Sequence, residues 1–531
     1  MFKRIAVVKV VLSAAICSVF FPIPSAIHSY AQTEPAAARS ALAFSTYFGG
    51  GKENWREETR GAGIAVDKQG YVYITGETQA HDFPSVNPAQ KRHGGGENDA
   101  FIAKFTPDGQ KLVYSTVLGG GDSDWAERIA VDDSGNAYIA GTTYSRNFPT
   151  TPQAAQRSFG GGDRDGFAAK FSADGKLVYA TLLGGDETDR CTAIDIDGAG
   201  NAYVTGSTNS SKFAALTGTP SEHPRKDWDV LVAKLDLSGS KFTYAFRFGG
   251  TNGNAPRRGG YGGEAGTGIK VGGSNTVYVV GYTDSADFPI RNGVQSKFGG
   301  RSDGFVVRLG ATGADLVSST YLGGAGSDRI SAVALDAIGN ISVTGKTEPI
   351  DFPSGPGPIQ QRATSGDFPV LNALQPKWTA FAGSAFVTRL NADLTEMQYS
   401  TYLNCGMNDN GADITVDSLG NTYIIGSSNV PRDLLLVNPL LLPQPANFLP
   451  AFVIELATDG RRIAFSTLLG NPYSNQGAGI AVDNIGDIYV IGTTGYGGGT
   501  NTTADFPTVR AFQPERINKS FQTFISKITT R

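Results

Sequence analysis

Residues 112–141 read LVYSTVLGGGDSDWAERIAVDDSGNAYIAG, and a variant of this stretch returns along most of the chain. Its second half is an apolar segment, a turn and another apolar segment. This half recurs as GIAVDKQGYVYITG (63–76), RIAVDDSGNAYIAG (128–141), AIDIDGAGNAYVTG (193–206), GIKVGGSNTVYVVG (268–281), AVALDAIGNISVTG (332–345), DITVDSLGNTYIIG (413–426) and GIAVDNIGDIYVIG (479–492). Asp, Gly, Ser and Asn in the turn tolerate the positive φ that short hairpins require. Each copy therefore predicts a β-hairpin.

A second predicted hairpin follows in every copy, as in AFIAKFTPDGQKLVYSTVLGG (100–120) and GFAAKFSADGKLVYATLLGG (166–185). A short Asp-Gly turn separates two segments rich in Val, Tyr, Phe and Thr, which favour strands. We name the four strands of a copy A, B, C and D in chain order. Four antiparallel strands, repeated seven times, are typical of an all-β fold, a seven-bladed β-propeller.

The chain ends support closure of the ring. Residues 42–50, LAFSTYFGG, form a strand D without its own A, B and C, and residues 521–530, FQTFISKITT, form a strand C without its D. The N-terminal strand is therefore predicted to complete the last blade, so that no sheet edge is left open. We expect residues 42–531 to form a single propeller, preceded by a short linker at 32–41.

The first 31 residues differ from the rest. Lys3, Arg4 and Lys9 precede the apolar run 10–21, and 29–31 read Ser-Tyr-Ala, which fits a signal peptide cleaved after Ala31. The apolar run is too short to span a bilayer. The interpretation is a secreted, periplasmic or cell-surface protein without a membrane span in its mature chain.

Composition excludes some function classes. The net charge is −4, and removal of the basic signal makes it more negative, so nucleic acid is not an expected partner. A chain with Gly 69 and 18% charged residues suits an all-β protein with many turns. Cys191 and Cys405 fall in different repeats and are interpreted as unpaired thiols.

The repeat resembles a known family. The string GG-x-x-x-D-x-x-x-x-IAVD-x-x-GN-x-Y-x-x-G, followed by Asp-Phe-Pro and later by DAF-x-AK, is similar to the bacterial seven-bladed propeller repeat called SBBP. The Phe-Pro element is expected at Asp82-Phe83-Pro84, Asn147-Phe148-Pro149, Asp287-Phe288-Pro289, Asp351-Phe352-Pro353 and Asp505-Phe506-Pro507. The resemblance implies the propeller fold and a secreted or surface bacterial protein. It implies no activity, because fold alone does not settle function.

Nearly all variation in loop length falls in the D–A and B–C connections, which alternation of strands places on one face. We call this face the platform and the opposite face, with the A–B and C–D turns, the base. Binding residues concentrate on such variable loops. The leading hypothesis is a binding or scaffold protein whose platform holds a protein or polysaccharide partner.

The D–A loops also present carboxylates that could ligate a cation. These are Asp122, Asp124, Glu187, Asp189, Asp328 and Asp409. Oxygen ligands of this kind suit Ca²⁺. The alternative interpretation is capping of turns or pairing with the adjacent Arg190 and Arg329. No other cofactor is predicted.

Three further features are candidate ligand-binding elements. Trp55 and Trp125 lie in consecutive D–A loops and would stack on a sugar or anchor a peptide, or else pack between blades. Arg257 and Arg258 lie at the centre of a glycine-rich loop at 249–268, which is either an anion contact or an irregular loop.

The apolar run 433–445 must be buried internally or against a partner. Leu440, Leu441 and Leu442 are predicted to lie in a partner-binding patch. The rest of the run is expected to tuck under Phe448 and Pro450.

Catalytic signals are sparse, and no catalytic residue is predicted. His81, His93 and His223 are assigned to different repeats and lack zinc-binding spacing. The alternative function is a hydrolase or lyase that acts on a polymer, with carboxylates gathered at the axial funnel. Binding without catalysis is the preferred hypothesis.

Overall fold

The computed structural model describes residues 40–52, 57–212, 228–251, 263–313, 315–349, 367–379, 382–429, 431, 434–440, 449–471, 474–495, 506–517 and 520–530. All of them belong to one compact unit, Arg39–Arg531. The predicted signal peptide lies outside the described residues. In the described part of the chain no helix has the length and apolar character needed to cross a membrane.

The described strands form seven antiparallel sheets of four strands each. Blade 1 holds β2 (Thr59–Val66), β3 (Val72–Thr78), β4 (Asp99–Phe105) and β5 (Leu112–Leu118); blade 2 holds β6 (Asp124–Val131), β7 (Ala137–Thr143), β8 (Asp165–Phe171) and β9 (Leu177–Leu183); blade 3 holds β10 (Asp189–Ile196), β11 (Ala202–Thr208), β12 (Asp229–Leu235) and β13 (Phe242–Phe248); blade 4 holds β14 (Ala265–Val271), β15 (Val277–Thr283), β16 (Asp303–Leu309) and β17 (Leu316–Leu322).

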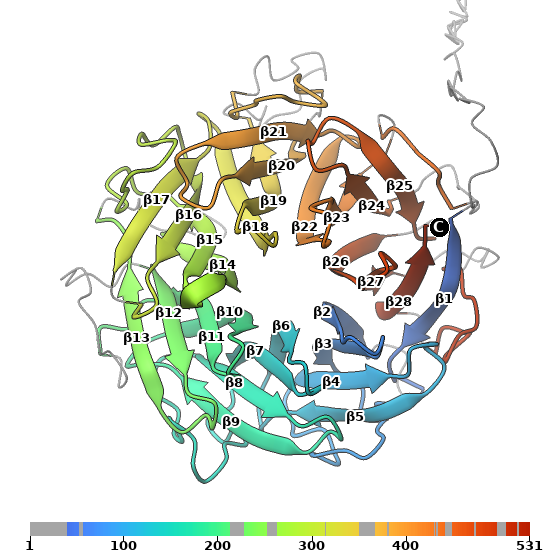
Figure 1. The fold of residues 1–531 in the computed structure, drawn as a ribbon. Coiled ribbons are helices and arrows are strands. Elements are labelled where there is room, and N and C mark those ends of the chain that lie inside the picture. Colours follow the sequence, from blue (N-terminus) through green and yellow to red (C-terminus); the bar gives the residue numbers. More distant parts are fainter. Residues whose placement is uncertain are drawn as a thin grey trace, which may run out of the picture. The chain divides into compact units, whose positions relative to one another are not determined.

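Blade 5 holds β18 (Ser327–Leu335), β19 (Ile341–Glu348), β20 (Ser384–Leu390) and β21 (Met397–Leu403); blade 6 holds β22 (Asn408–Val416), β23 (Thr422–Asn429), β24 (Ala451–Leu456) and β25 (Ile463–Leu469); blade 7 holds β26 (Asn475–Val482), β27 (Ile488–Thr494), β28 (Gln522–Thr529) and β1 (Ala41–Phe48). Figure 1 shows the blades arranged in a ring, with each strand A innermost and each strand D outermost. The predicted all-β, seven-bladed propeller is confirmed.

The ring closes as the sequence predicts. In blade 7 the strand order is β1-β28-β27-β26, and β1 pairs antiparallel with β28 from Ala41↔Thr529 to Phe48↔Thr523. Figure 1 shows the blue β1 beside the red β28. The last blade is thus built from both ends of the propeller.

The base face is held by a repeated contact between blades. In blade 1 the hydroxyl of Tyr73 donates to Asp67 Oδ2 at 2.9 Å and lies 3.1 Å from the carbonyl of Gly135 in blade 2. The ammonium of Lys234 lies 3.4 Å from Asp197, and Lys527 lies 3.8 Å from Asp483, so basic residues of strand C pair with the Asp that follows strand A. The Tyr73 contact therefore joins blades 1 and 2, and the Lys–Asp pairs brace turns within their own blades.

The C–D turns pack on aromatic rings of the preceding blade. Gly175 has φ +87°, and a Cβ there would lie 2.5 Å from Cγ of Tyr114 in strand D of blade 1. The same arrangement joins Phe44 with Gly109, Tyr179 with Gly239, Tyr244 with Gly313 and Tyr399 with Gly460. A small residue in the turn therefore makes room for a large ring.

One junction reverses this pattern. At the boundary of blades 4 and 5, Ser318 takes the strand D position of the aromatic residue, and Leu394, with φ +65°, takes the turn position of the glycine. Leu394 is fully buried. The side-chain volume lost in strand D is regained in the turn.

This exchange predicts strong coupling between the two positions. Ser318→Tyr alone should destabilise the fold by overpacking, by about 1–3 kcal/mol. Leu394→Gly alone should leave a cavity that costs about 2–5 kcal/mol. The double variant recreates the junction found between other blades. Its free energy of unfolding should therefore be higher than the value expected from adding the two single losses. Urea unfolding of the four proteins measures this coupling, and strictly additive effects would contradict it.

In blades 1, 4, 5 and 7 the B–C connection pairs with the outer edge of the blade. Val86 pairs with Ser115 of strand D, and the same bridge recurs at Arg291↔Ser319, Leu371↔Ser400 and Ser45↔Val509. These backbone contacts blunt edges that would otherwise attract other strands. The Phe of the Phe-Pro element precedes the bridge and is buried; Phe288 stacks on Phe305 with ring centroids 4.7 Å apart.

One predicted Phe-Pro element needs correction. The residues 351–353 lie outside the described residues, and Phe368-Pro369 takes the position of the element in blade 5. Phe368 is buried, and its ring centroid lies 4.3 Å from that of Phe386. In blade 6, Leu434 takes this position and packs beside the core.

Candidate functional site

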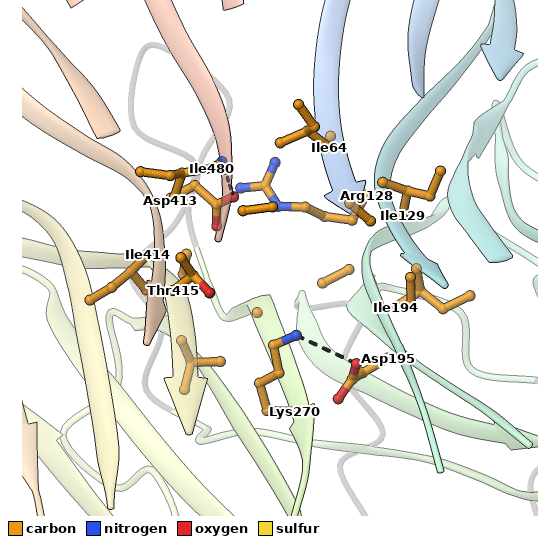
Figure 2. A pocket seen from close by; sticks show the side chains of 18 of the residues that line it. Ile64, Arg128, Ile129, Ile194, Asp195, Lys270, Asp413, Ile414, Thr415 and Ile480 are labelled. Carbon is orange, nitrogen blue, oxygen red and sulfur yellow. Dashed lines mark hydrogen bonds and ion pairs between the residues drawn. The ribbon is translucent and has the colours of Figure 1, made fainter. Parts of the chain in front are cut away.

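A cavity of about 260 Å³ lies on the axis of the ring, lined by the strand A of all seven blades. Its walls are mainly Ile, Val and Ala, and four charged residues reach it: Arg128, Asp195, Lys270 and Asp413. Figure 2 shows these side chains converging from different strands. The cavity is the candidate for the axial funnel that the sequence predicts.

The charged groups of the axial cavity have partners within the ring. Arg128 donates to the carbonyls of Ala62 in blade 1 and Ala412 in blade 6, both at 3.2 Å, so its guanidinium ties together strands of three blades. Asp195 accepts from the Val271 backbone at 2.8 Å and lies 3.4 Å from Lys270 Nζ. Asp413 accepts from the Ile480 backbone at 3.0 Å. Sequence reasoning did not single out Arg128.

Each strand A contains a β-bulge, in which one residue departs from the alternating direction of the side chains. The bulges lie at the level of the carbonyls to which Arg128 donates. The bulged residues are Ala62, Glu127, Thr192, Thr267, Ser331, Ala412 and Ala478. Bulges re-aim side chains in this way and are frequent near functional sites. Glu127 is the single acid among these bulged residues. Burial raises its pKa, although the charge of Arg128 and a hydrogen bond with Trp125 act in the opposite direction.

The predicted metal-binding carboxylates lie apart from one another. Asp124, Asp189, Asp328 and Asp409 are each buried at the start of a strand A in a different blade. Each accepts backbone N–H groups of its own D–A loop: Asp124 from Gly120 at 2.7 Å, and Asp409 from Cys405 and Gly406 at 2.9 Å. The exposed Asp122 lies in the loop itself. Across the residues with described positions, no group of three or more His, Cys, Asp or Glu could hold a metal ion.

Three of these buried residues, Asp124, Asp189 and Asp328, each approach one acid of the preceding blade. A Cβ at Gly323 would lie 2.7 Å from Asp303 Oδ1 and 2.9 Å from Asp328 Oδ2, so the glycine after strand D lets the two carboxyls come together. Gly119 has the same position between Asp99 and Asp124. Burial is the first cause that raises the pKa of Asp99 to about 7 and that of Asp124 to about 6.

The histidine assignment from sequence was wrong in one respect. His81 and His93 lie in one B–C connection, with ring centroids 4.8 Å apart. His93 Nε2 contacts the Thr78 carbonyl at 3.2 Å, and burial lowers the pKa of His93. Their ring contact gives the pair a packing role.

Trp125, which was expected in a D–A loop, is the second residue of β6, at the end of the strand that the D–A loop enters. Its ring centroid is 5.4 Å from that of Tyr144, and both side chains are half-buried. Arg164 donates to the Tyr144 hydroxyl at 2.7 Å. In the next blade, Arg190 stacks on Trp228 with its Cζ 5.7 Å from the ring centroid. We call Trp125, Tyr144, Arg164, Arg190 and Trp228 the platform arc.

Leu440 is 6% exposed and packs in a core cluster with Tyr47 and Phe465. Leu435 and Leu436 of the same apolar run are 58% and 41% exposed. They follow the outer edge of β25, since Ser466 Oγ donates to the Leu435 carbonyl at 2.6 Å. Part of the run is therefore buried and part faces outward. Trp55, Arg257, Arg258, Leu441 and Leu442 lie outside the described residues, so their roles stay predictions.

The fold and its blade junctions define a class, the seven-bladed β-propellers. Within that class the chain carries SBBP repeats: the family model of the SBBP beta-propeller repeat matches residues 44–84, 113–149, 178–214 and 398–431. No curated protein sequence matches the chain.

Solved structures align with the chain at low similarity. Raptor from Chaetomium thermophilum aligns with a TM-score of 0.44 and 8% identity, over 92% of this chain and 29% of that chain, so this chain spans less than a third of Raptor. A PL25 ulvan lyase aligns with a TM-score of 0.40 and 10% identity, over 89% and 96%. A quinohemoprotein alcohol dehydrogenase from Comamonas testosteroni aligns with a TM-score of 0.39 and 9% identity, over 92% and 76%.

Proposed function

We propose that the chain is a secreted binding protein whose platform face holds a protein or polysaccharide partner. The observation that carries this proposal is the difference between the two faces. The base is made of short turns with one repeated hydrogen-bond pattern: Gly70 donates to Asp67, and Gly135 to Asp132, both at 2.9 Å. The platform carries connections of very different length, from 284–302 in blade 4 to 349–383 in blade 5. Variable loops on a rigid ring are where binding residues concentrate.

The axial cavity gives less support to the alternative, a hydrolase or lyase. Glycoside hydrolysis uses a pair of carboxyl groups with access to the substrate, and a lyase needs an accessible base. Asp195 is engaged by Lys270 and the Val271 backbone, and Asp413 by the Ile480 backbone. Arg128 bridges blades on the same axis. The residues of the cavity therefore hold the ring together, and the platform remains the better candidate surface.

The proposal is tested by blocking one face at a time. Asp122 and Ser134 are exposed residues of blade 2, the first in a D–A loop and the second in an A–B turn. The variants Asp122→Cys and Ser134→Cys are labelled with a large maleimide polymer, because Cys191 and Cys405 are buried and should not react. Both proteins are then assayed against neutral and charged polysaccharides and secreted bacterial proteins.

We expect the label on the platform to reduce retention of the bound partner at least tenfold, and the label on the base to leave it within twofold. New reducing ends or unsaturated products are measured in parallel, and none is expected. Loss of binding with the base label alone would contradict the proposal. Turnover of a polysaccharide would favour the alternative.

A further inference from the structure

The platform arc is a continuous row of aromatic and cationic side chains across blades 2 and 3. Trp125 contacts Tyr144, and Tyr144 accepts a hydrogen bond from Arg164. The row crosses the blade junction where the Asp189 backbone donates to the Arg164 carbonyl at 2.8 Å, which places Arg164 beside Arg190. Arg190 then stacks on Trp228. All five side chains are half-buried, so each keeps part of its surface open.

The two arginines of the arc are cations without a carboxylate partner. Among the residues that the structure describes, neither Arg164 nor Arg190 forms an ion pair, and the buried Nε atom of each has no hydrogen-bond partner. The nearby acids, Asp163 for Arg164 and Glu127 for Arg190, act on them only at longer range. Burial first, and then the charge of Arg190, lower the pKa of Arg164. Two neighbouring guanidinium groups that lack an ion-pair partner favour the binding of an anionic ligand.

Other arginines at the strand position of Arg190 differ from it. Arg60 also stacks on an aromatic ring, that of Phe521, but Glu58 neutralises it at 2.6 Å. Arg329 stacks on Tyr282. The residue across its blade junction is Ser302, which takes the position that Arg164 has beside Arg190. Among these four described arginines, Arg164 and Arg190 are the two that lie side by side and are flanked by aromatic rings.

We propose that the platform arc binds an anionic polysaccharide, with its acidic groups on Arg164 and Arg190 and its sugar rings against Trp125, Tyr144 and Trp228. This inference rests on the proposed function and gives it a ligand class. A pyranose offers an apolar C–H face for an aromatic ring, and its carboxylate or sulfate ester offers oxygen atoms to a guanidinium. Because these two features repeat along the polymer, they match a row that spans two blades. An acidic peptide lacks a flat apolar face beside each charge.

The test uses the mature full chain and four probes: polygalacturonate oligomers for carboxylates, dextran sulfate for sulfate esters, neutral dextran, and poly-glutamate for an acidic peptide. Calorimetric titration compares the wild type with the Arg164→Gln/Arg190→Gln variant. Arg329→Gln is the matched control, since it removes an arginine from the same strand position and face. Thermal unfolding confirms that the variants are folded.

We expect one of the two anionic polysaccharides to bind at least tenfold more tightly than neutral dextran or poly-glutamate, with affinity that falls as salt rises. The double variant should lose at least tenfold in affinity, and Arg329→Gln should stay within twofold. Tightest binding to poly-glutamate, equal binding by the double variant, or no binding of either anionic polysaccharide would overturn the arc proposal. None of these results would overturn the proposed function. That proposal has its own test: it fails if the polymer label on the base blocks binding of a partner and the label on the platform does not.

Discussion

A chain that lacks residues 41–50 is expected to lose cooperative unfolding and to aggregate. The deletion removes β1, whose Phe44, Tyr47 and Phe48 are at most 2% exposed. Burial of each such side chain contributes about 1.5–3 kcal/mol, and the whole fold is stabilised by only about 5–15 kcal/mol. Loss of this strand therefore removes a large part of the total stability.

The deletion would also disturb both neighbours of β1. The edge of β28 would expose unpaired backbone groups, which recruit strands of other molecules. Phe44 would no longer fill the space beside Gly109 of blade 1, and the Phe506 backbone would lose its hydrogen bond of 2.9 Å to the Tyr47 hydroxyl. The effect should spread to the whole ring, because blade 7 links blades 6 and 1.

A rearranged chain provides the control for the deletion. Since Ala41 pairs with Thr529, a copy of residues 41–50 joined after Thr530 by a short Gly-Ser linker should form the C–D hairpin that the other blades already have. Urea unfolding followed by circular dichroism, together with gel filtration, compares the three chains. Rescue by the added copy is expected. A deletion variant that unfolds in one transition at the wild-type midpoint would contradict this view of ring closure.

The architecture was readable from the sequence because its signals are local and repeated. Alternation, Asp-Gly turns and the unpaired strands at 42–50 and 521–530 specify the strands, their order and the closure. The Phe-Pro element of blade 5 was misassigned because two Asp-Phe-Pro strings lie in one connection. Spacing was the signal that could have decided between them: Phe368 precedes Ser384 by the same interval as Phe83 precedes Asp99.

The candidate site was harder to predict because it depends on contacts between blades. Asp124 and Asp189 have the residue type of metal ligands, yet the first position of strand A turns them into the blade junction. Arg164, Arg190 and Trp228 share no sequence motif and occupy different strand positions. Only the packing of blade 2 on blade 3 brings them beside Trp125 and Tyr144. A platform arc of this kind has no signature in a single copy of the repeat.

The paired carboxyl groups at the blade junctions have a second consequence, a dependence of stability on pH. Burial raises the pKa of Asp165 to about 7 and that of Asp189 to about 6, and the pKa values of Asp303 and Asp328 both rise to about 7. The ordinary value is 3.8. Between about pH 4 and pH 7 the folded chain therefore holds protons that the unfolded chain has released. The free energy of unfolding must fall as pH rises through this range.

We expect the wild-type chain to be more stable at pH 5 than at pH 8. At the higher pH the buried carboxyl pairs lose their protons, and the ionised form is the one that burial disfavours. At about 1.4 kcal/mol for each unit of pKa difference, one carboxyl group such as Asp124 contributes roughly 3 kcal/mol over the whole range from below pH 4 to pH 8, and roughly half of that between pH 5 and pH 8. Below pH 4 a different set acts: hydrogen bonds outweigh burial and lower the pKa of Asp132 and Asp197, so their stabilising effect is lost on acidification. Maximal stability should lie between these two ranges.

The Asp124→Asn variant distinguishes the contribution of a junction carboxyl group to the pH dependence of stability from that of all other titrating groups. An amide fits this position, because Asn475 occupies it at the start of β26 and accepts from the Asn471 backbone at 3.2 Å. The variant should therefore fold, and its unfolding free energy should fall less steeply between pH 5 and pH 8 than that of the wild type. Asp133→Asn, which changes an exposed carboxylate of the same blade, should leave the slope unchanged. Urea unfolding at constant ionic strength and at four pH values provides the measurement. A wild-type stability that stays flat or increases from pH 5 to pH 8 would show that these carboxyl groups are ionised in the folded chain, with their charges balanced inside the junction.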